Sequence, residues 1–218
     1  MIELEDIRKT YHARSGAVEV LRGIHLRVEK GEKVGILGRN GAGKSTLIRL
    51  IGGIERQTSG TITQTMRVSW PLAFTGAFQG TLTGIDNVKF ICRIYDKTFE
   101  EVIEFVQDFS QLGRFLREPV KIYSSGMRAR LAFAISLMID FDCYLIDEIV
   151  AVGDSRFLAK SHEELFVRRK DRALILVSHD PHYMRDHCDR ACVLVEGRLH
   201  HFKAVDDALQ FHQEMMAA

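Results

Sequence analysis

This sequence is best interpreted outward from the stretch Gly38-Arg39-Asn40-Gly41-Ala42-Gly43-Lys44-Ser45-Thr46. The stretch matches the pattern Gly-x4-Gly-Lys-Ser of a phosphate-binding loop. Its glycines let consecutive backbone N–H groups turn toward one anion, and a helix that starts at the end of the loop adds its dipole. Lys44 supplies a positive charge for the β- and γ-phosphates, the Ser45 hydroxyl can ligate Mg²⁺, and Thr46 can add a hydroxyl contact. All residues of the stretch are therefore candidate nucleotide-binding residues.

The segments on either side of the loop have the character that such a loop requires. Residues 33–37 form a short apolar strand that runs directly into the loop, and residues 44–51 have helical periodicity. Gly52-Gly53 then offers a C-cap. A chance glycine-rich turn is the alternative, which the flanking strand and helix disfavour. The loop predicts a bound nucleotide, but by itself it does not say which reaction follows.

Two acidic residues follow a second apolar strand, in Tyr144-Leu145-Ile146-Asp147-Glu148. In P-loop ATPases an acid at a strand tip holds Mg²⁺, usually through water, and this is the role predicted for Asp147. Glu148 can point the other way and polarise the attacking water. Solvated surface acids are the alternative, and the phosphate-binding loop upstream disfavours it.

A histidine follows a third apolar strand, in Leu174-Ile175-Leu176-Val177-Ser178-His179-Asp180. The carboxyl ends of strands in an open parallel sheet form the ligand crevice, so His179 is placed to bond the γ-phosphate and orient water. A lone histidine is more often structural, and only this position favours a functional role. Four further histidines lack such a position and are predicted to be surface or packing residues: His182, His187, His200 and His201.

The order of elements predicts an α/β fold with a mostly parallel sheet. Strands with alternating apolar residues open the chain, over residues 2–7 and 18–28, and they are expected to be antiparallel. Helical spacing dominates from about residue 80 to 119 and predicts an inserted helical lobe over roughly residues 80–140. The remaining predicted elements alternate: helix 127–139, strand 143–146, helix 157–169, strand 174–177 and helix 206–215. We expect residues 1–218 to form a single domain.

The composition narrows the classes of protein to consider. A formal net charge of +1 in 218 residues argues against a dedicated nucleic-acid binder. No stretch reaches the roughly 18–20 apolar residues of a membrane span, and the acidic start is unlike a signal peptide. We therefore expect a cytosolic protein whose membrane role, if any, needs a partner. Cys188 and Cys192 lie near histidines, so a metal site is conceivable, but reduced buried cysteines are the favoured interpretation.

Tyr123-Ser124-Ser125-Gly126-Met127 precedes a predicted helix and forms a second candidate anion site. Small hydroxyl residues and a glycine at a helix start bring amide groups and the helix dipole to one point. Taken alone, this is an ordinary helix N-cap. A second site becomes useful if two chains face each other and each completes the nucleotide site of its partner.

These motifs together resemble the ABC ATPase family, whose signature Leu-Ser-Gly-Gly-Gln stands at this place. Tyr123, Ser125 and Met127 depart from the signature, so the resemblance assigns the γ-phosphate role only to Ser124 and Gly126. The phosphate-binding loop, a glutamine, the signature, Asp-Glu and the histidine follow in the family's order over nearly the whole chain. The resemblance implies an enzyme that binds and hydrolyses ATP with Mg²⁺, as a dimer of two copies.

The resemblance implies roles for three further residues. Tyr11, in Arg8-Lys9-Thr10-Tyr11, matches the aromatic residue that stacks on adenine, and an ordinary strand tyrosine is the alternative. Gln79 matches the glutamine that senses Mg²⁺ and water and links to the membrane partner, although the loop after it is short. Asp154 stands where the family has its dimer-contacting loop.

Three stretches that depart from the usual family sequence resemble the polysaccharide-exporter branch of the family, and most of all its capsular-polysaccharide exporters. They are Tyr-Ser-Ser-Gly-Met, Ala-Val-Gly-Asp after the acids, and Phe-Gln-Gly-Thr-Leu-Thr-Gly. The resemblance implies integral-membrane permease subunits, further envelope-spanning export proteins, no nucleic acid, and a peripheral place on the cytoplasmic face of the inner membrane. A teichoic-acid or O-antigen exporter, a lipid or small-molecule transporter, and a soluble ABC ATPase acting on ribosomes or DNA are the alternatives.

Overall fold

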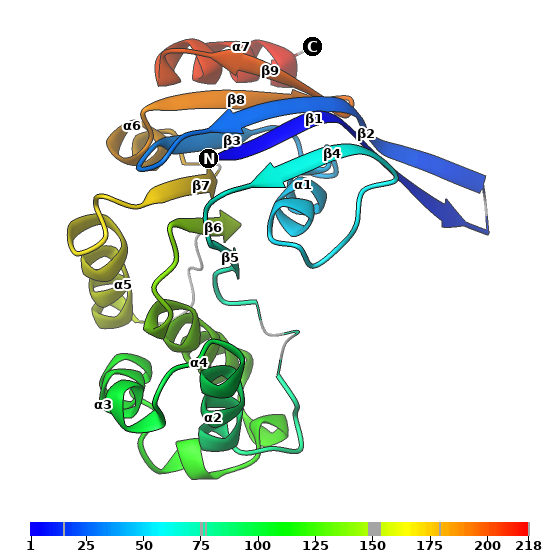
Figure 1. Cartoon of the computed structure of the whole chain (residues 1–218). Helices are drawn as coiled ribbons and strands as arrows, with labels where there is room; N and C mark the ends of the chain where they lie inside the picture. Colours follow the sequence, from blue (N-terminus) through cyan, green and yellow to red (C-terminus); the bar gives the residue numbers. More distant parts are fainter. Residues whose placement is uncertain (15, 75, 77, 148–153, 179, 218) are drawn as a thin grey trace. The chain divides into compact units, whose positions relative to one another are not determined.

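The computed structural model describes residues 1–218 except 15, 75, 77, 148–153, 179 and 218 (Figure 1). The chain divides into two compact units. The first, here the sheet unit, comprises Met1–Pro71, Phe141–Ile149 and Asp171–Ala218. The second, here the helical unit, comprises Leu72–Asp140 and Val150–Lys170.

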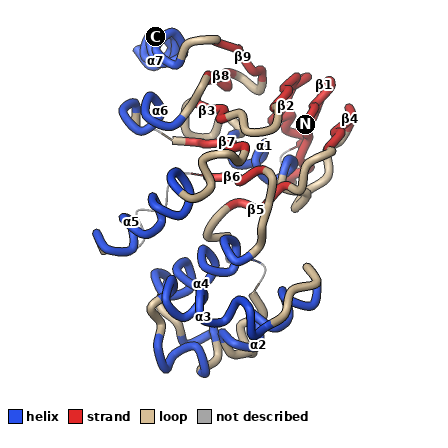
Figure 2. Tube along the Cα trace, turned by 60° about the vertical axis from the view of Figure 1, so that its left-hand side comes forward, coloured by secondary structure: helices blue, strands red, loops and turns tan. Residues whose placement is uncertain are grey.

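The sheet unit contains two sheets (Figure 2). One is antiparallel, with the order β2-β1-β4, from β1 (Ile2–Ala13), β2 (Gly16–Val28) and β4 (Ser59–Gln64). The other has the order β5-β6-β7-β3-β8-β9, from β3 (Lys33–Leu37), β5 (Val68–Pro71), β6 (Cys143–Asp147), β7 (Ala173–Val177), β8 (Arg190–Val195) and β9 (Arg198–Phe202). Only β9 runs antiparallel among its described strands. The predicted α/β fold, with its parallel core and antiparallel N-terminal strands, is confirmed.

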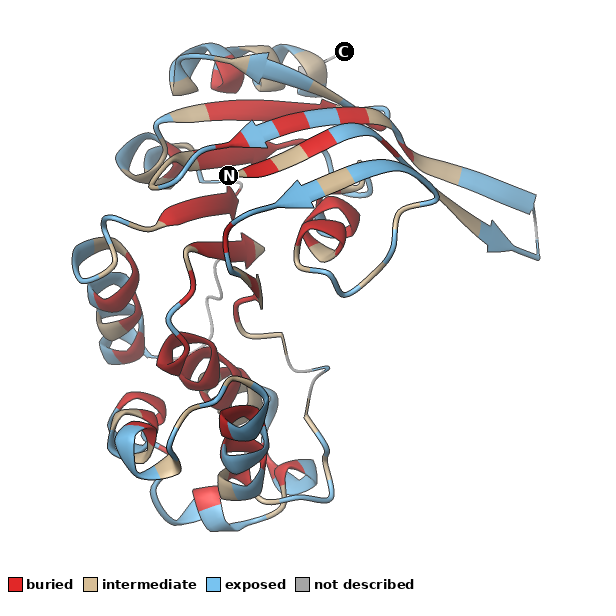
Figure 3. Cartoon of the chain, in the orientation of Figure 1, coloured by how far each residue is buried: buried red, intermediate tan, exposed pale blue. Residues whose placement is uncertain are grey.

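Burial explains why the central strands are continuous apolar runs. Every residue of β7 is buried, and so are the last four of β3 (Figure 3). Parallel strands covered on both faces show this pattern, whereas β1 alternates and buries only Ile2, Leu4 and Ile7 on its core side. Helix α1 (Lys44–Ile51) contributes buried Leu47 and Ile48 to the same core as both sheets.

The predicted strand 33–37 and helix 44–51 are confirmed, including the C-cap at Gly52. The last predicted helix is α7 (Val205–Ala217). The strands β4, β5 and β9 and helix α6 (Pro181–His187) were not predicted. Helix α6 begins after Asp180, whose carboxylate accepts hydrogen bonds from the backbone N–H groups of His182 and Tyr183.

The helical unit is built on helices that meet around aromatic side chains. Its helices are α2 (Gly84–Ile94), α3 (Phe99–Ser110), α4 (Ser125–Met138) and α5 (Ser155–His162), with 3-10 turns at Gly113–Arg117 and Val120–Ile122. A π-helical turn, Glu163–Val167, continues α5. The predicted helix 157–169 therefore consists of an α-helical part followed by a π-helical turn. The Phe109 ring lies 5.6 Å from that of Phe133 and 5.2 Å from that of Phe157. Offset and edge contacts of this kind are the geometry that aromatic pairs prefer.

Within the described part of the chain, none of the helices has the length and apolar character that crossing a bilayer requires.

Candidate functional site

The phosphate-binding loop joins β3 to α1 through backbone conformations that require glycine. Gly38, Gly41 and Gly43 have φ values of 150°, 82° and 106°. Gly43 is the N-cap of α1, and its carbonyl accepts a hydrogen bond from the N–H of Leu47 at 2.9 Å. The loop therefore ends with the exposed amide groups and the positive dipole end of α1, the arrangement that binds phosphate.

Lys44 is the first residue of α1, and its side chain folds back over the loop. Its Nζ donates hydrogen bonds to the carbonyl oxygens of Gly38 (2.7 Å) and Arg39 (3.0 Å). Only 6% of Lys44 is exposed. A buried ammonium group held above the loop places a full positive charge beside the amide groups, where a polyphosphate would need it.

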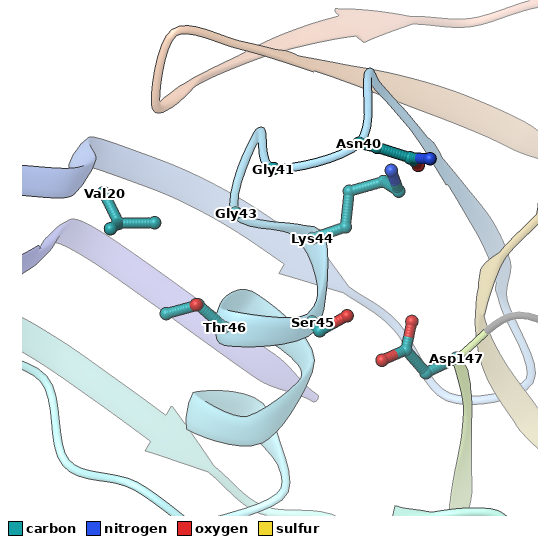
Figure 4. A pocket seen from close by; sticks show the side chains of 8 residues that line it. All are labelled: Val20, Asn40, Gly41, Gly43, Lys44, Ser45, Thr46 and Asp147. Atoms are coloured by element: carbon teal, nitrogen blue, oxygen red, sulfur yellow. The ribbon is translucent and has the colours of Figure 1, made fainter.

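The loop borders a hollow of about 500 Å³. Its described lining residues come from β2, the phosphate-binding loop, the start of α1 and the end of β6: Val20, Asn40, Gly41, Gly43, Lys44, Ser45, Thr46 and Asp147 (Figure 4). Asp147 ends β6, which pairs with β7, and β7 pairs with β3. The strand order thus brings an acid 103 positions after Lys44 to the edge where the phosphate-binding loop begins.

Ser45 and Asp147 form an oxygen-rich side of this hollow. The Ser45 hydroxyl and the Asp147 carboxylate point toward one another in Figure 4. Hard divalent cations such as Mg²⁺ take oxygen ligands and keep several waters. These two side chains therefore fit a magnesium ion that is bound next to phosphates.

A substitution at Gly38 tests how strictly the loop depends on its backbone. A Cβ on Gly38 would lie 2.6 Å from the carbonyl oxygen of Leu194, a backbone atom of β8 that cannot move aside. We expect the backbone conformation alone to lower the free energy of unfolding of Gly38→Ala by about 1–3 kcal/mol. The collision with Leu194 should lower it further. Urea unfolding measures this loss. Gly53→Ala is the control, because Gly53 also has positive φ but a Cβ there meets open space. Equal losses in the two variants would contradict the assigned constraint.

Tyr11 lies on β1 in a polar cluster. Its hydroxyl donates a 2.6 Å hydrogen bond to Glu55, and the Nζ of Lys9 lies 4.9 Å from the centre of its ring. Tyr11 is not among the described residues that line the hollow. Val20 lines it from β2, and sequence interpretation missed this residue because a valine in an apolar strand carries no functional signal.

Gln79, Ser124 and Gly126 belong to the helical unit. The backbone of Gln79 is held by Asn87, whose Oδ1 accepts from the Gln79 N–H at 3.1 Å and whose Nδ2 donates to the Gln79 carbonyl at 3.3 Å. Asn87 is 2% exposed and escaped prediction, because nothing in its local sequence marks it. The Gln79 side chain itself is exposed.

Ser124 is the N-cap of α4, and its Oγ accepts a hydrogen bond from the N–H of Met127 at 3.2 Å. Ser124, Gly126 and Met127 line a second hollow of about 330 Å³, together with Gln111, Leu112, Phe115 and Arg130. The exposed start of α4 is thus a helix N-terminus that borders open space, as a second anion site requires.

The structure explains the tyrosine at the first position of the signature-like motif. Tyr123 is 3% exposed, and its hydroxyl donates a hydrogen bond to the carbonyl of Phe115. Burial raises the pKa of Tyr123 to about 12. Tyr123 therefore fills the interior of the helical unit beside Gly84, where a Cβ would collide with the hydroxyl. The two predicted catalytic residues, Glu148 and His179, lie outside the described residues.

A glycine loop between a strand and a helix, with an acid on a neighbouring parallel strand, defines a P-loop nucleotide-binding protein. Residues 21–151 match the family model described as ABC transporter. The chain belongs to the ABC transporter family.

Curated relatives match the chain from end to end. It is 59% identical over 214 residues to the ATP-binding protein BexA of Haemophilus influenzae, which covers 98% of this chain and 99% of BexA. It is 57% identical over 215 residues to the capsule polysaccharide export ATP-binding protein CtrD of Neisseria meningitidis serogroup B, covering 99% and 100%. The teichoic acids export ATP-binding protein TagH of Staphylococcus saprophyticus is more distant, at 33% identity over 98% of this chain and 81% of TagH. The resemblance to the polysaccharide-exporter branch is confirmed.

Solved structures agree on the fold. A dimeric ATP-binding cassette in a post-hydrolysis state with ADP and Pi superposes with a TM-score of 0.77 at 21% identity. The match covers 91% of this chain and 96% of that one. At this identity the likeness establishes the ABC ATPase fold.

Proposed function

We propose that this chain is the ATP-hydrolysing motor subunit of a bacterial exporter of capsular polysaccharide. One observation carries the proposal: the hollow that joins Lys44, Ser45 and Asp147 lies in a chain that matches CtrD over its whole length. The hollow supports ATP binding, and the full-length match to a capsule polysaccharide export protein supports the transported substrate.

The chain's own residues would divide the work of hydrolysis. The loop residues 38–46 hold the phosphates, with the Lys44 ammonium against the β- and γ-phosphates. Ser45 and Asp147 would hold Mg²⁺, directly or through water, and when bound the ion would neutralise charge on the phosphate oxygens. Gln79 keeps its proposed role as the residue that senses Mg²⁺ and water. Glu148 accepts the proton of the attacking water, and His179 orients that water and the γ-phosphate.

Ser124 and Gly126 would act on the nucleotide of a second copy. Their place at the exposed start of α4 supports this role, since amide groups and a helix dipole there are open to an external anion. A dimeric solved cassette with ADP and Pi has the same fold. In this proposal ATP holds two copies together, and hydrolysis lets them separate.

The closure of two copies would be transmitted to integral-membrane permease subunits near Gln79 and the helical unit. The motor would then sit peripherally on the cytoplasmic face of the inner membrane, with further envelope-spanning export proteins completing the path. The permease subunits move the polymer, so the motor need not touch it, and no nucleic acid takes part.

Complementation tests the proposed substrate. In a Neisseria meningitidis serogroup B strain that lacks CtrD, this chain should restore surface capsule, measured by antibody binding to intact cells. The Glu148→Gln chain, expressed to the same level, should leave the polymer inside the cell. Failure of the wild-type chain, despite stable expression and ATPase activity, would contradict capsule export.

A teichoic-acid or O-antigen exporter remains the second candidate, because TagH also matches nearly the whole chain. The difference between 57% and 33% identity favours capsule export. Restoration of teichoic-acid export in a strain lacking TagH, without restoration of capsule, would reverse that order. Co-purification with ribosomes or DNA in place of a membrane protein would favour a soluble ABC ATPase.

A further inference from the structure

Glu55 lies at the centre of a polar network in the sheet unit. Its Oε2 accepts the 2.6 Å hydrogen bond from the Tyr11 hydroxyl and lies 3.4 Å from the Nζ of Lys9. Its Oε1 lies 2.6 Å from the Nε of Arg49. Both carboxylate oxygens are therefore engaged: Oε1 forms an ion pair with Arg49, and Oε2 accepts a hydrogen bond of the stronger, charge-assisted kind from Tyr11.

The network joins two elements of the candidate nucleotide site. Arg49 lies in the last turn of α1, the helix that begins at Lys44, and its Nη2 lies 3.4 Å from the Thr46 hydroxyl oxygen. Tyr11 lies on β1. Glu55 thus holds an aromatic ring of β1 at a set distance from the helix that carries the phosphate-binding loop.

A contact with Lys9 also fixes the orientation of the Tyr11 ring. The ammonium of Lys9 lies on the ring and donates a 2.7 Å hydrogen bond to the carbonyl of Arg56, which keeps it in place. The ring face attracts the ammonium, so this contact helps to fix the orientation of the Tyr11 ring. Burial alone would raise the pKa of Glu55, but the Tyr11 hydrogen bond and the Arg49 and Lys9 charges lower it, so the group is a carboxylate.

Two valines of β2 lie near this ring and near the phosphate hollow, one at each place. Tyr11 pairs across the strands with Val18, which is 52% exposed although it is apolar. Val20, two residues further along β2, lines the hollow. A ligand whose phosphates occupy the hollow would direct its ring system past Val20 toward the side of β2 that pairs with Tyr11.

We propose that Glu55 is a positioning residue for nucleotide binding, which sets the Tyr11 ring where it stacks on the adenine base. This inference rests on the proposed function, because it takes ATP as the ligand and Tyr11 as the stacking residue. Glu55 acts on the base through Tyr11, and it is proposed to touch neither the phosphates nor the reacting water.

The test is Glu55→Gln in the full chain, with steady-state ATP hydrolysis and binding of a fluorescent ATP analogue as readouts. The amide keeps the size of the side chain but removes the charge that holds Tyr11, Lys9 and Arg49. We expect KM for ATP to rise roughly 3- to 10-fold while kcat stays within about twofold. The variant should lose binding energy equally in the ground state and the transition state, so the chemical step is unaffected. Glu29→Gln is the matched control, because Glu29 makes an exposed ion pair with Arg27 on the same unit.

Two further measurements separate positioning from a general effect on the fold. Tyr11→Phe keeps the ring and removes only the hydroxyl, so it should raise KM similarly, and Glu55→Gln should add nothing in that background. Competition by inorganic tripolyphosphate, which has no base, should be unchanged in every variant. Additive effects, an unchanged KM in both variants, or an equal loss of tripolyphosphate binding would overturn the inference.

The outcomes also distinguish this inference from the proposed function. If wild-type chain bound no ATP, the proposed function itself would fail. If Tyr11→Ala lowered ATP affinity but Glu55→Gln and Tyr11→Phe did not, the site would stand and the role of Glu55 would be refuted. Should Glu55→Gln not fold, as thermal unfolding would reveal, the Tyr11→Phe result decides the question by itself.

Discussion

Glu148→Gln should hydrolyse ATP about 10²–10⁴-fold more slowly than the wild type while it binds ATP with nearly unchanged affinity. The reason is that glutamine cannot accept the proton of the attacking water, although it preserves the volume of the side chain. The phosphate-binding loop, Lys44 and Asp147 are unchanged in this variant, so they would still hold the phosphates and Mg²⁺ as proposed. Because hydrolysis would separate the two copies, the variant should accumulate as a dimer with ATP.

Single-turnover hydrolysis gives the chemical rate of this variant, and size-exclusion chromatography with ATP gives its dimer fraction. Glu104→Gln is a suitable control, since Glu104 is an exposed acid on α3 and is not among the described lining residues of either hollow. Hydrolysis at the wild-type rate in Glu148→Gln would remove Glu148 from the role of base. A variant that is slow but stays monomeric with ATP would contradict the proposed dimer cycle.

Lys44→Ala should weaken ATP binding by about 100-fold or more, equivalent to about 3 kcal/mol of binding free energy. Lys44 is buried, two carbonyl oxygens hold its ammonium over the loop, and alanine removes the positive charge that phosphates would bond. Lys44→Arg should also bind poorly, because a planar guanidinium cannot replace a compact ammonium in this confined position.

Equilibrium binding of a fluorescent ATP analogue measures this loss, and thermal unfolding checks that the variant keeps its fold. Lys30→Ala is the control, because Lys30 is an exposed lysine of the same unit. ATP affinity within about threefold of the wild type in Lys44→Ala would refute the assignment of the hollow as a phosphate site.

The elements that carry the phosphate-binding loop were predictable because their signals are local. A strand buried on both faces must be apolar throughout, and the helix after it needs the apolar spacing of 44–51, so both could be recognised within a few residues. The strands β4 and β9 could not, because they are short and partly exposed and their sequences lack a strong alternation. Their pairing with β1 and β8 is what makes them strands.

The candidate site also has features that local sequence predicts and features that depend on tertiary packing. The sequence by itself determined which residue types can bind phosphate and metal, because a glycine loop before a helix start and an acid at a strand tip are defined by neighbouring residues. Only the tertiary structure decided that Asp147 faces Ser45, since this follows from the strand order β6-β7-β3. Only the tertiary structure also joined Tyr11 to Glu55, which is 44 residues away, because hydrogen bonds between distant segments depend on packing and leave no local pattern.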